Sequence, residues 1–193
     1  MTDDILEHFE RFMEKPSLGT FEAARSALIG SPAYQPYSQD LYQAEKLFEE
    51  RRYQEVLQAI AGTRPNLLLS PRAHLLVGMA CKELGKPEDS QAEMMFMQLC
   101  LHGIKLTGDG SADRPFKVTR VSDEYDVLMS LGKKLEMQAL SKAGGRACDA
   151  MTLEGGGTLF FDINDCISRL RDGDLPDRRP PAGNKKWWQF WRS

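Results

Sequence analysis

The chain has 193 residues, 41% of them hydrophobic and 27% charged, which suits one globular domain or two small ones with a real core. The net charge of −3 is uneven, because residues 176–193 hold five basic side chains against one acidic and the preceding 175 residues carry −7. An acidic body gives no support to general nucleic-acid binding by the folded part, since phosphate contacts need a basic face.

The sequence lacks the usual signs of membrane insertion or export. No stretch approaches the roughly 20 continuous apolar residues that span a bilayer, and the acidic, amphipathic start MTDDILEHFERF is unlike a secretory signal. We therefore expect a cytoplasmic protein. The cysteines, none in a C-x-x-C pair, are expected to be buried free thiols, and they are Cys81, Cys100, Cys148 and Cys166.

Residues 1–104 are predicted to form a helical region. Apolar residues at helical spacing indicate a first helix that stops at Lys15-Pro16, and a second follows with Thr20 as N-cap and Gly30 as C-cap. The stretch SPAYQPYS then reads as an extended link, because it holds two prolines.

A repeat follows this link. The small or apolar positions Ala44 and Val56 recur as Gly78 and Ser90, an offset of 34, and the turn residue Arg51 recurs as Gly85. Over residues 38–104 the chain resembles the tetratricopeptide repeat family. The resemblance implies two degenerate antiparallel helix pairs, in which the first helix of each pair lines a concave groove that binds proteins or peptides.

If this resemblance holds, the groove would be lined by residues of two helices, with Arg72 and Lys82 able to pair with a peptide carboxylate. The alternative, that both cations are merely solvated, is equally open. The groove candidates are Leu41, Glu45, Phe48, Arg72, Leu75, Met79 and Lys82.

Residues 105–170 are predicted to form a small β-α-β-β unit that packs on the last helices, which makes the fold class α+β. PFKVTRV alternates as a strand, Ser122 is expected to cap a helix over DEYDVLMSLGKKLEMQAL, and EGGG joins the strands RACDAMTL and TLFFDI. Residues 105–164, with GDG…PFKVTRVSDEYDVL, CDAM and LFFDI, resemble a bacterial domain of unknown function. That resemblance implies a fold relation and no activity.

We find no pattern of residues typical of catalysis, and we expect no cofactor or metal. Cys100 and His102 point to different helix faces, and a nucleophilic Cys148 would need a histidine close in space. The acidic residues Asp123, Glu124 and Asp126 are explained as first-turn carboxylates at the positive end of a helix.

The last segment carries the sharpest functional signal. Residues 171–184 are rich in proline and glycine and should form a tether, disordered or extended. The aromatic-basic residues that follow are Lys185, Lys186, Trp187, Trp188, Phe190, Trp191 and Arg192. Four large aromatic side chains are costly to leave in water, so we expect something to cover them.

Three interpretations of this tail stay open: it docks on a protein surface, it lies on an anionic membrane surface, or it has no role. The sequence favours a non-catalytic adaptor that binds a protein or peptide through its helical repeats, with the tail as a second docking contact. The alternatives are a peripheral membrane protein anchored by the tail and an unrecognised enzyme. The sequence does not determine the partner or the oligomeric state.

Overall fold

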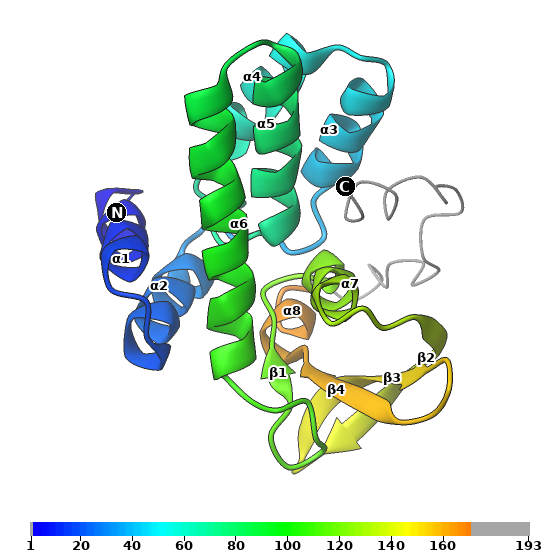
Figure 1. Ribbon diagram of the computed structural model, residues 1–193. Helices are drawn as coiled ribbons and strands as arrows, with labels where there is room; N and C mark the ends of the chain where they lie inside the picture. The colour runs from blue at the N-terminus through cyan, green and yellow to red at the C-terminus, as the bar shows by residue number, and fades with distance from the viewer. Residues whose placement is uncertain (1, 171–193) are drawn as a thin grey trace.

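A computed structural model describes residues 2–170, with side chains from residue 4 onward, and confirms the α+β fold class (Figure 1). The helices in this part are α1 (Thr2–Glu14), α2 (Leu18–Gly30), α3 (Asp40–Glu49), α4 (Tyr53–Thr63), α5 (Pro71–Glu83), α6 (Pro87–Leu106), α7 (Val121–Ser130) and α8 (Asn164–Ile167). The strands are β1 (Phe116–Lys117), β2 (Leu135–Ala143), β3 (Arg146–Leu153) and β4 (Thr158–Asp162).

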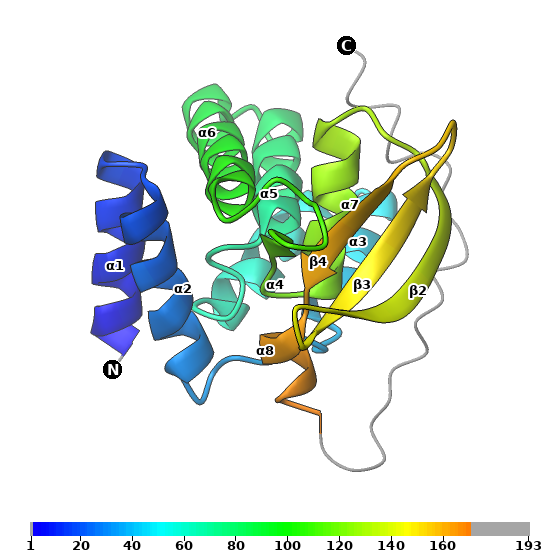
Figure 2. The same ribbon diagram turned by 90° about the horizontal axis from the view of Figure 1, so that it is seen from below.

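The first six helices form three successive pairs, α1 with α2, α3 with α4, and α5 with α6 (Figures 1 and 2). Helix α4 packs on α5, so the second and third pairs stack, while α2 contacts α6 on the other side. The long α6 runs from the helical layer down to the sheet (Figure 1). None of the helices within residues 2–170 is long and apolar enough to cross a membrane.

The 34-residue offset is visible in how α3 and α5 end. The N–H groups of Arg51 and Arg52 donate to the carbonyls of Phe48 and Leu47, at 3.0 and 2.9 Å. The same two bonds recur 34 residues later, from Gly85 to Lys82 and from Lys86 to Cys81. Both turn residues adopt positive φ, 59° at Arg51 and 71° at Gly85, which is the left-handed conformation of a Schellman helix end.

Gly78, the small residue of the second repeat, lies where its helix packs closely against the next one, as the repeat pattern predicts. A Cβ atom on Gly78 would lie 3.2 Å from the carbonyl oxygen of Ser90 and 3.3 Å from the methyl carbon of Met94, both on α6. Gly78 and the buried Ser90 therefore let α5 and α6 approach closely. The repeat geometry follows the predicted pattern, while membership of the tetratricopeptide repeat family stays a prediction.

The predicted helix caps need correction. Helix α2 begins one turn earlier than expected, with Ser17 as its N-cap, and Thr20 instead completes the capping box from inside the first turn. Gly30 is the last helical residue, and the C-cap is Ser31 in an extended conformation. The helix starts earlier because the Ser17 hydroxyl accepts from the N–H of Thr20 at 3.2 Å and so caps the first turn.

The strands form one sheet in the order β1-β4-β3-β2, with β1 parallel to β4 and the other pairs antiparallel. The predicted hairpin between β3 and β4 is confirmed, and Gly155, Gly156 and Gly157 in its turn all have positive φ. A second hairpin, β2–β3, turns through Gly144 and Gly145, again both at positive φ, as a type I′ turn requires.

The prediction of one helix over residues 123–140 is wrong for its second half, because residues 135–143 form strand β2. The small unit predicted as β-α-β-β is therefore β-α-β-β-β. Helix α7 stops at Ser130 because Gly132 takes a φ of 64° and Lys133 donates to the carbonyl of Leu128 at 2.9 Å. The helix-forming residues beyond it then pair along β3, so tertiary pairing overrides local propensity.

The helical and α/β halves share one hydrophobic core. A single cluster joins Phe12 and Phe21 of the first pair, Ile104 of α6, and Met151 and Phe161 of the sheet, all essentially fully buried. A second cluster lies among α3, α4 and α5. The predicted boundary at 104–105 therefore falls close to the end of α6, but it does not separate two cores.

Replacing Arg51 by glycine should stabilise the protein, because Arg51 holds a left-handed conformation that costs a side-chain-bearing residue about 1 kcal/mol. Replacing Gly85 by alanine at the matching position should destabilise it by a similar amount. Denaturant unfolding of each variant measures the change in its free energy of unfolding. Changes of the same sign in the two variants would contradict the proposed equivalence of the two turns.

Candidate functional site

The residues predicted to line a groove lie on α3 and α5, and most of them contact the chain itself. Leu41 packs inside the second core cluster, while Leu75 and Met79 belong to the large shared cluster that also includes residues of α7. Phe48 is partly buried with its ring 5.2 Å from that of Tyr53, and Lys82 is exposed. The structure therefore leaves little of this predicted groove surface for a peptide.

Arg72, the cation that we expected to be available to a peptide carboxylate, already has two carboxylate partners. Its Nη1 donates to Glu45 on α3 at 3.0 Å, and its Nε donates to Asp126 on α7 at 2.8 Å. Asp126 is buried, and burial raises its pKa even though the charge of Arg72 opposes the shift. Arg72 thus links the second and third helical pairs, through α3 and α5, to helix α7 of the α/β half.

The acidic residues of α7 do more than complement the helix dipole. The N-cap of α7 is Arg120, not the predicted Ser122, and Asp123 closes the first turn from its third position. Its Oδ2 accepts from the backbone N–H groups of Thr119 and Arg120, at 3.0 and 3.2 Å, and from the Thr119 hydroxyl at 2.8 Å. Burial raises the pKa of Asp123 to about 6.

A polar contact ties α7 to the sheet. The Gln138 amide on β2 donates to Glu124 at 3.2 Å and to Asp149 at 2.9 Å, and its oxygen accepts from the Tyr125 hydroxyl at 2.6 Å. Burial, with the nearby charges of Glu124 and Asp149, raises the pKa of Tyr125 to about 12. This contact explains why a polar residue of β2 faces α7.

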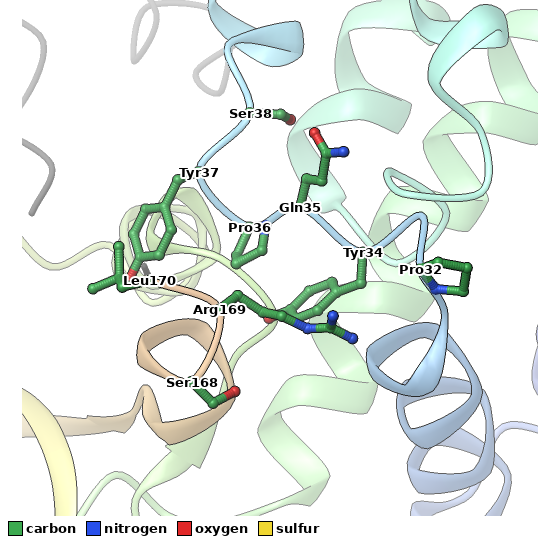
Figure 3. A pocket seen from close by; sticks show the side chains of 9 residues that line it. All are labelled: Pro32, Tyr34, Gln35, Pro36, Tyr37, Ser38, Ser168, Arg169 and Leu170. Atoms are coloured by element: carbon green, nitrogen blue, oxygen red, sulfur yellow. The ribbon is translucent and has the colours of Figure 1, made fainter. Parts of the chain in front are cut away.

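An open cleft of about 610 Å³ lies where the link between α2 and α3 meets the end of α8 (Figure 3). In Figure 3 the guanidinium of Arg169 lies over the ring of Tyr34, with 5.5 Å from its central carbon to the ring centroid. The lining residues are Pro32, Tyr34, Gln35, Pro36, Tyr37, Ser38, Ser168, Arg169 and Leu170. Among the tyrosines and prolines of this lining, Pro32 and Tyr37 keep solvent exposure, while Tyr34 and Pro36 are buried.

The link that forms this wall is held by buried groups. The Tyr34 hydroxyl donates to the carbonyl of Thr119 at 2.7 Å. Asn66 accepts from the N–H of Gln35 at 3.0 Å and donates to its carbonyl at 3.2 Å, as a neighbouring strand would. Arg120 in turn donates to the carbonyl oxygen of Asn66 at 2.8 Å. The wall is therefore anchored to the N-terminus of α7.

The cleft was missed because its residues come from segments far apart in sequence. SPAYQPYS is a link, as predicted, but it is not extended, because Tyr34 and Ser38 donate to the carbonyls of Ser31 and Gln35 in two successive turns. Nothing in this stretch predicts that Asn66 and Arg120 would hold it. An asparagine that follows a proline and precedes three leucines, in RPNLLLS, is the local sequence signal, and it is weak. The tail residues Lys185, Lys186, Trp187, Trp188, Phe190, Trp191 and Arg192, like the tether before them, lie outside the described residues.

The four cysteine thiols and the His74 ring are buried and packed within the fold. Burial raises the pKa of all four cysteine thiols, that of Cys166 to about 12, which opposes the thiolate that a nucleophile needs. His74 is buried with Nδ1 2.6 Å from Glu93 and Nε2 2.8 Å from the carbonyl of Leu68, and it stacks on Phe9. Within residues 2–170, no group of three or more potential ligands could hold a metal ion.

No protein-family model matches this chain, and no curated protein or solved structure matches it either.

Removing the carboxylate of Asp126 should destabilise the protein by about 3 kcal/mol, because it leaves the guanidinium of Arg72 buried with one partner fewer. The variant is Asp126→Ala, measured by denaturant unfolding. Glu55→Ala is the control, since Glu55 pairs with Arg52 on the surface, and it should change stability little. Equal losses in the two variants would contradict the role assigned to Arg72.

The raised pKa of Asp123 predicts a pH dependence. Because its pKa is about 6 in the folded state and about 3.9 when unfolded, its favourable contribution is full below pH 4 and is lost as pH rises through 6. Asp123→Asn removes this titration and keeps an acceptor. The wild type should therefore gain stability relative to Asp123→Asn between pH 7 and pH 5, and a constant difference over that range would contradict the shift.

Proposed function

We propose that this chain is a non-catalytic, cytoplasmic adaptor that binds a protein or peptide on its helical half, with the aromatic-basic tail as a second docking contact. The predicted groove between α3 and α5 is the first surface to consider, but its residues are mostly engaged within the chain. The cleft beside the α2–α3 link is an accessible hollow in the described part that could hold a bound segment.

The lining of this cleft is the observation that carries the proposal. The rings of Pro32 and Tyr37 keep some exposure beside the polar groups of Gln35 and Ser38, and such a mixed aromatic and polar surface suits extended, proline-containing peptides. The wall is pre-ordered by Tyr34 and Asn66, so a ligand would not have to order it on binding. Arg169, which is exposed, adds a positive charge at the rim.

The place at which the described residues end, at Leu170, supports a second contact by the tail that follows in sequence. Leu170 lines the cleft, and 23 residues follow it, so a partner held in the cleft lies next to the start of the tether. Two linked contacts reinforce each other through effective concentration if the tether spans both sites. This arrangement would let two individually weak contacts give useful affinity.

A second candidate function rests on the composition of the tail. Tryptophan favours the membrane interface, and lysine and arginine favour anionic lipid by about 1 kcal/mol each. The tail holds three tryptophans, one phenylalanine and three cations within residues 185–192. In this alternative the chain is a peripheral membrane protein held reversibly at the inner face of the membrane.

The adaptor proposal predicts that the full chain selects proline-containing, extended peptides from a displayed random library. Tyr37→Ala should weaken the binding of the selected peptides by at least about 10-fold, because one truncated aromatic contact costs over 1 kcal/mol. Tyr42→Ala is the matched control, since Tyr42 is exposed on α3 away from the cleft lining. Equal binding by both variants would remove the cleft from the proposal.

The membrane alternative is tested with the tail's own fluorophores. All three tryptophans of the chain lie in residues 187–191, so tryptophan emission reports on the tail alone. Vesicles of anionic lipid should shift this emission to the blue and should carry the protein into the pellet, and neutral vesicles should not. Absence of any shift with anionic vesicles at low salt would exclude the membrane as the docking surface.

A further inference from the structure

Within residues 2–170, strand β2 is a long edge of the sheet with no strand paired on its outer side. It pairs with β3 on one side, and the strand order β1-β4-β3-β2 leaves its other side at the sheet boundary (Figure 2). At the opposite boundary β1 is only two residues long, whereas β2 has nine. An edge strand of this length is a template for pairing with another strand.

The backbone groups that the edge offers follow from the β2–β3 register. Ala143 and Arg146 flank a two-residue turn, so they exchange hydrogen bonds, and the alternation of an antiparallel ladder extends this to Ser141 and Ala139. The residues between them, Gln138, Leu140 and Lys142, therefore direct their N–H and C=O groups away from β3. These groups are positioned for a further strand.

Apolar side chains flank this edge on both faces. Leu140 is 59% exposed and Met137 is 57% exposed. Residues of opposite parity point to opposite faces of a strand, so Leu140 lies on the face toward α7, with Gln138, and Met137 lies on the other. A strand added at the edge would cover part of both side chains, which a partner resting on one face would not.

We propose that the occupant of this edge is a second copy of the chain, so that β2 pairs with β2 of its partner in an antiparallel, two-fold symmetric dimer. Only a two-fold axis perpendicular to the sheet generates such a pair, and it must pass midway between the two strands, level with one residue of β2. An axis level with Ala139 places Glu136 opposite Lys142 of the partner subunit, twice by symmetry. It also places one of the two alanines of the strand beside the axis.

Charge makes this arrangement selective. Strand β2 carries the acidic Glu136 near its start and the basic Lys142 near its end, and both side chains are exposed. Antiparallel pairing therefore places unlike charges opposite each other. Parallel pairing would instead set Glu136 beside Glu136 and Lys142 beside Lys142. Glu136 also sits at a register irregularity, between the β3-paired residues Leu135 and Met137, so its side chain is not held by a residue of β3.

The other possible occupants fit less well. The aromatic-basic tail of the same chain carries Lys185, Lys186 and Arg192 and no acidic side chain from residue 178 onward, so it offers no carboxylate side chain to place opposite Lys142. A foreign strand would need the same acidic-to-basic pattern that the second copy has by identity. The dimer is independent of the proposed cleft, because β2 contributes no residue to it.

The first test measures the mass of the full chain by sedimentation velocity from about 1 to 200 µM, since an edge-only contact suits a micromolar dimer. Glu136→Lys and Lys142→Glu should each weaken the dimer by about 10-fold through like-charge contacts, and the double reversal should restore it. Glu10→Lys, an exposed change on α1, is the control for net charge and should leave the dimer intact.

The second test fixes the register. Ala139 would face Ala139 of the partner subunit across the axis with Cα atoms about 4.5 Å apart, within reach of a disulfide. Ala139→Cys should therefore cross-link when oxygen oxidises the two thiols with a copper–phenanthroline catalyst. Ser141→Cys should not, since it faces Met137 of its partner, and the native cysteines are all buried.

Two outcomes would overturn the proposal. One is a monomer at every concentration. The other is a dimer that the single charge reversals leave unchanged or that the double reversal fails to restore. If the chain is a monomer, a shift of its tryptophan emission when Met137 and Leu140 are both replaced by lysine would place the tail of the same chain on the edge.

Discussion

The two halves of the chain are joined by two arginines that contact the N-terminal part of α7, the partly buried Arg72 and the fully buried Arg120. Arg72 reaches from α5 to Asp126, and Arg120, the N-cap of α7, reaches to Asn66 in the segment before α5. Breaking a buried pair costs more than making it gains, so such contacts fix one relative placement even where they add little net stability. The position of α7, and with it the sheet, follows from this constraint.

Several features depend on that placement. Once α7 is fixed, Val127 and Leu128 extend the core that α1, α2 and α6 began, and Gln138 is drawn under α7 by Glu124 and Tyr125. The side-chain oxygen of Asn66 accepts hydrogen bonds from both Arg120 and the N–H of Gln35. The contact that joins the two halves therefore also orders the wall of the cleft. The cleft is in this sense a product of the interface, although its lining lies mostly on the helical side.

Much of the helical half could be predicted from sequence, because its determinants are local. The offset of 34 identified the two turns and the close approach at Gly78, and the triple glycine identified the β3–β4 hairpin. Strand β2 could not be predicted from residue propensity, because Leu, Glu, Met, Gln and Ala favour helices. Its pairing with β3 determines that this segment is a strand. Gly144-Gly145 was a usable turn signal that the helical interpretation overlooked.

The role of α7 could not be predicted, since it depends on contacts between distant segments. An acidic first turn has a sufficient local explanation in the helix dipole, and Asp123 confirms that explanation. Asp126, one turn later, lies where the dipole effect has faded, and its carboxylate serves Arg72 instead. A carboxylate beyond the first turn of a predicted helix, among apolar residues, therefore indicates a buried cation elsewhere in the fold. Here that cation was already among the predicted groove residues, which is why the surface expected to hold a peptide holds α7.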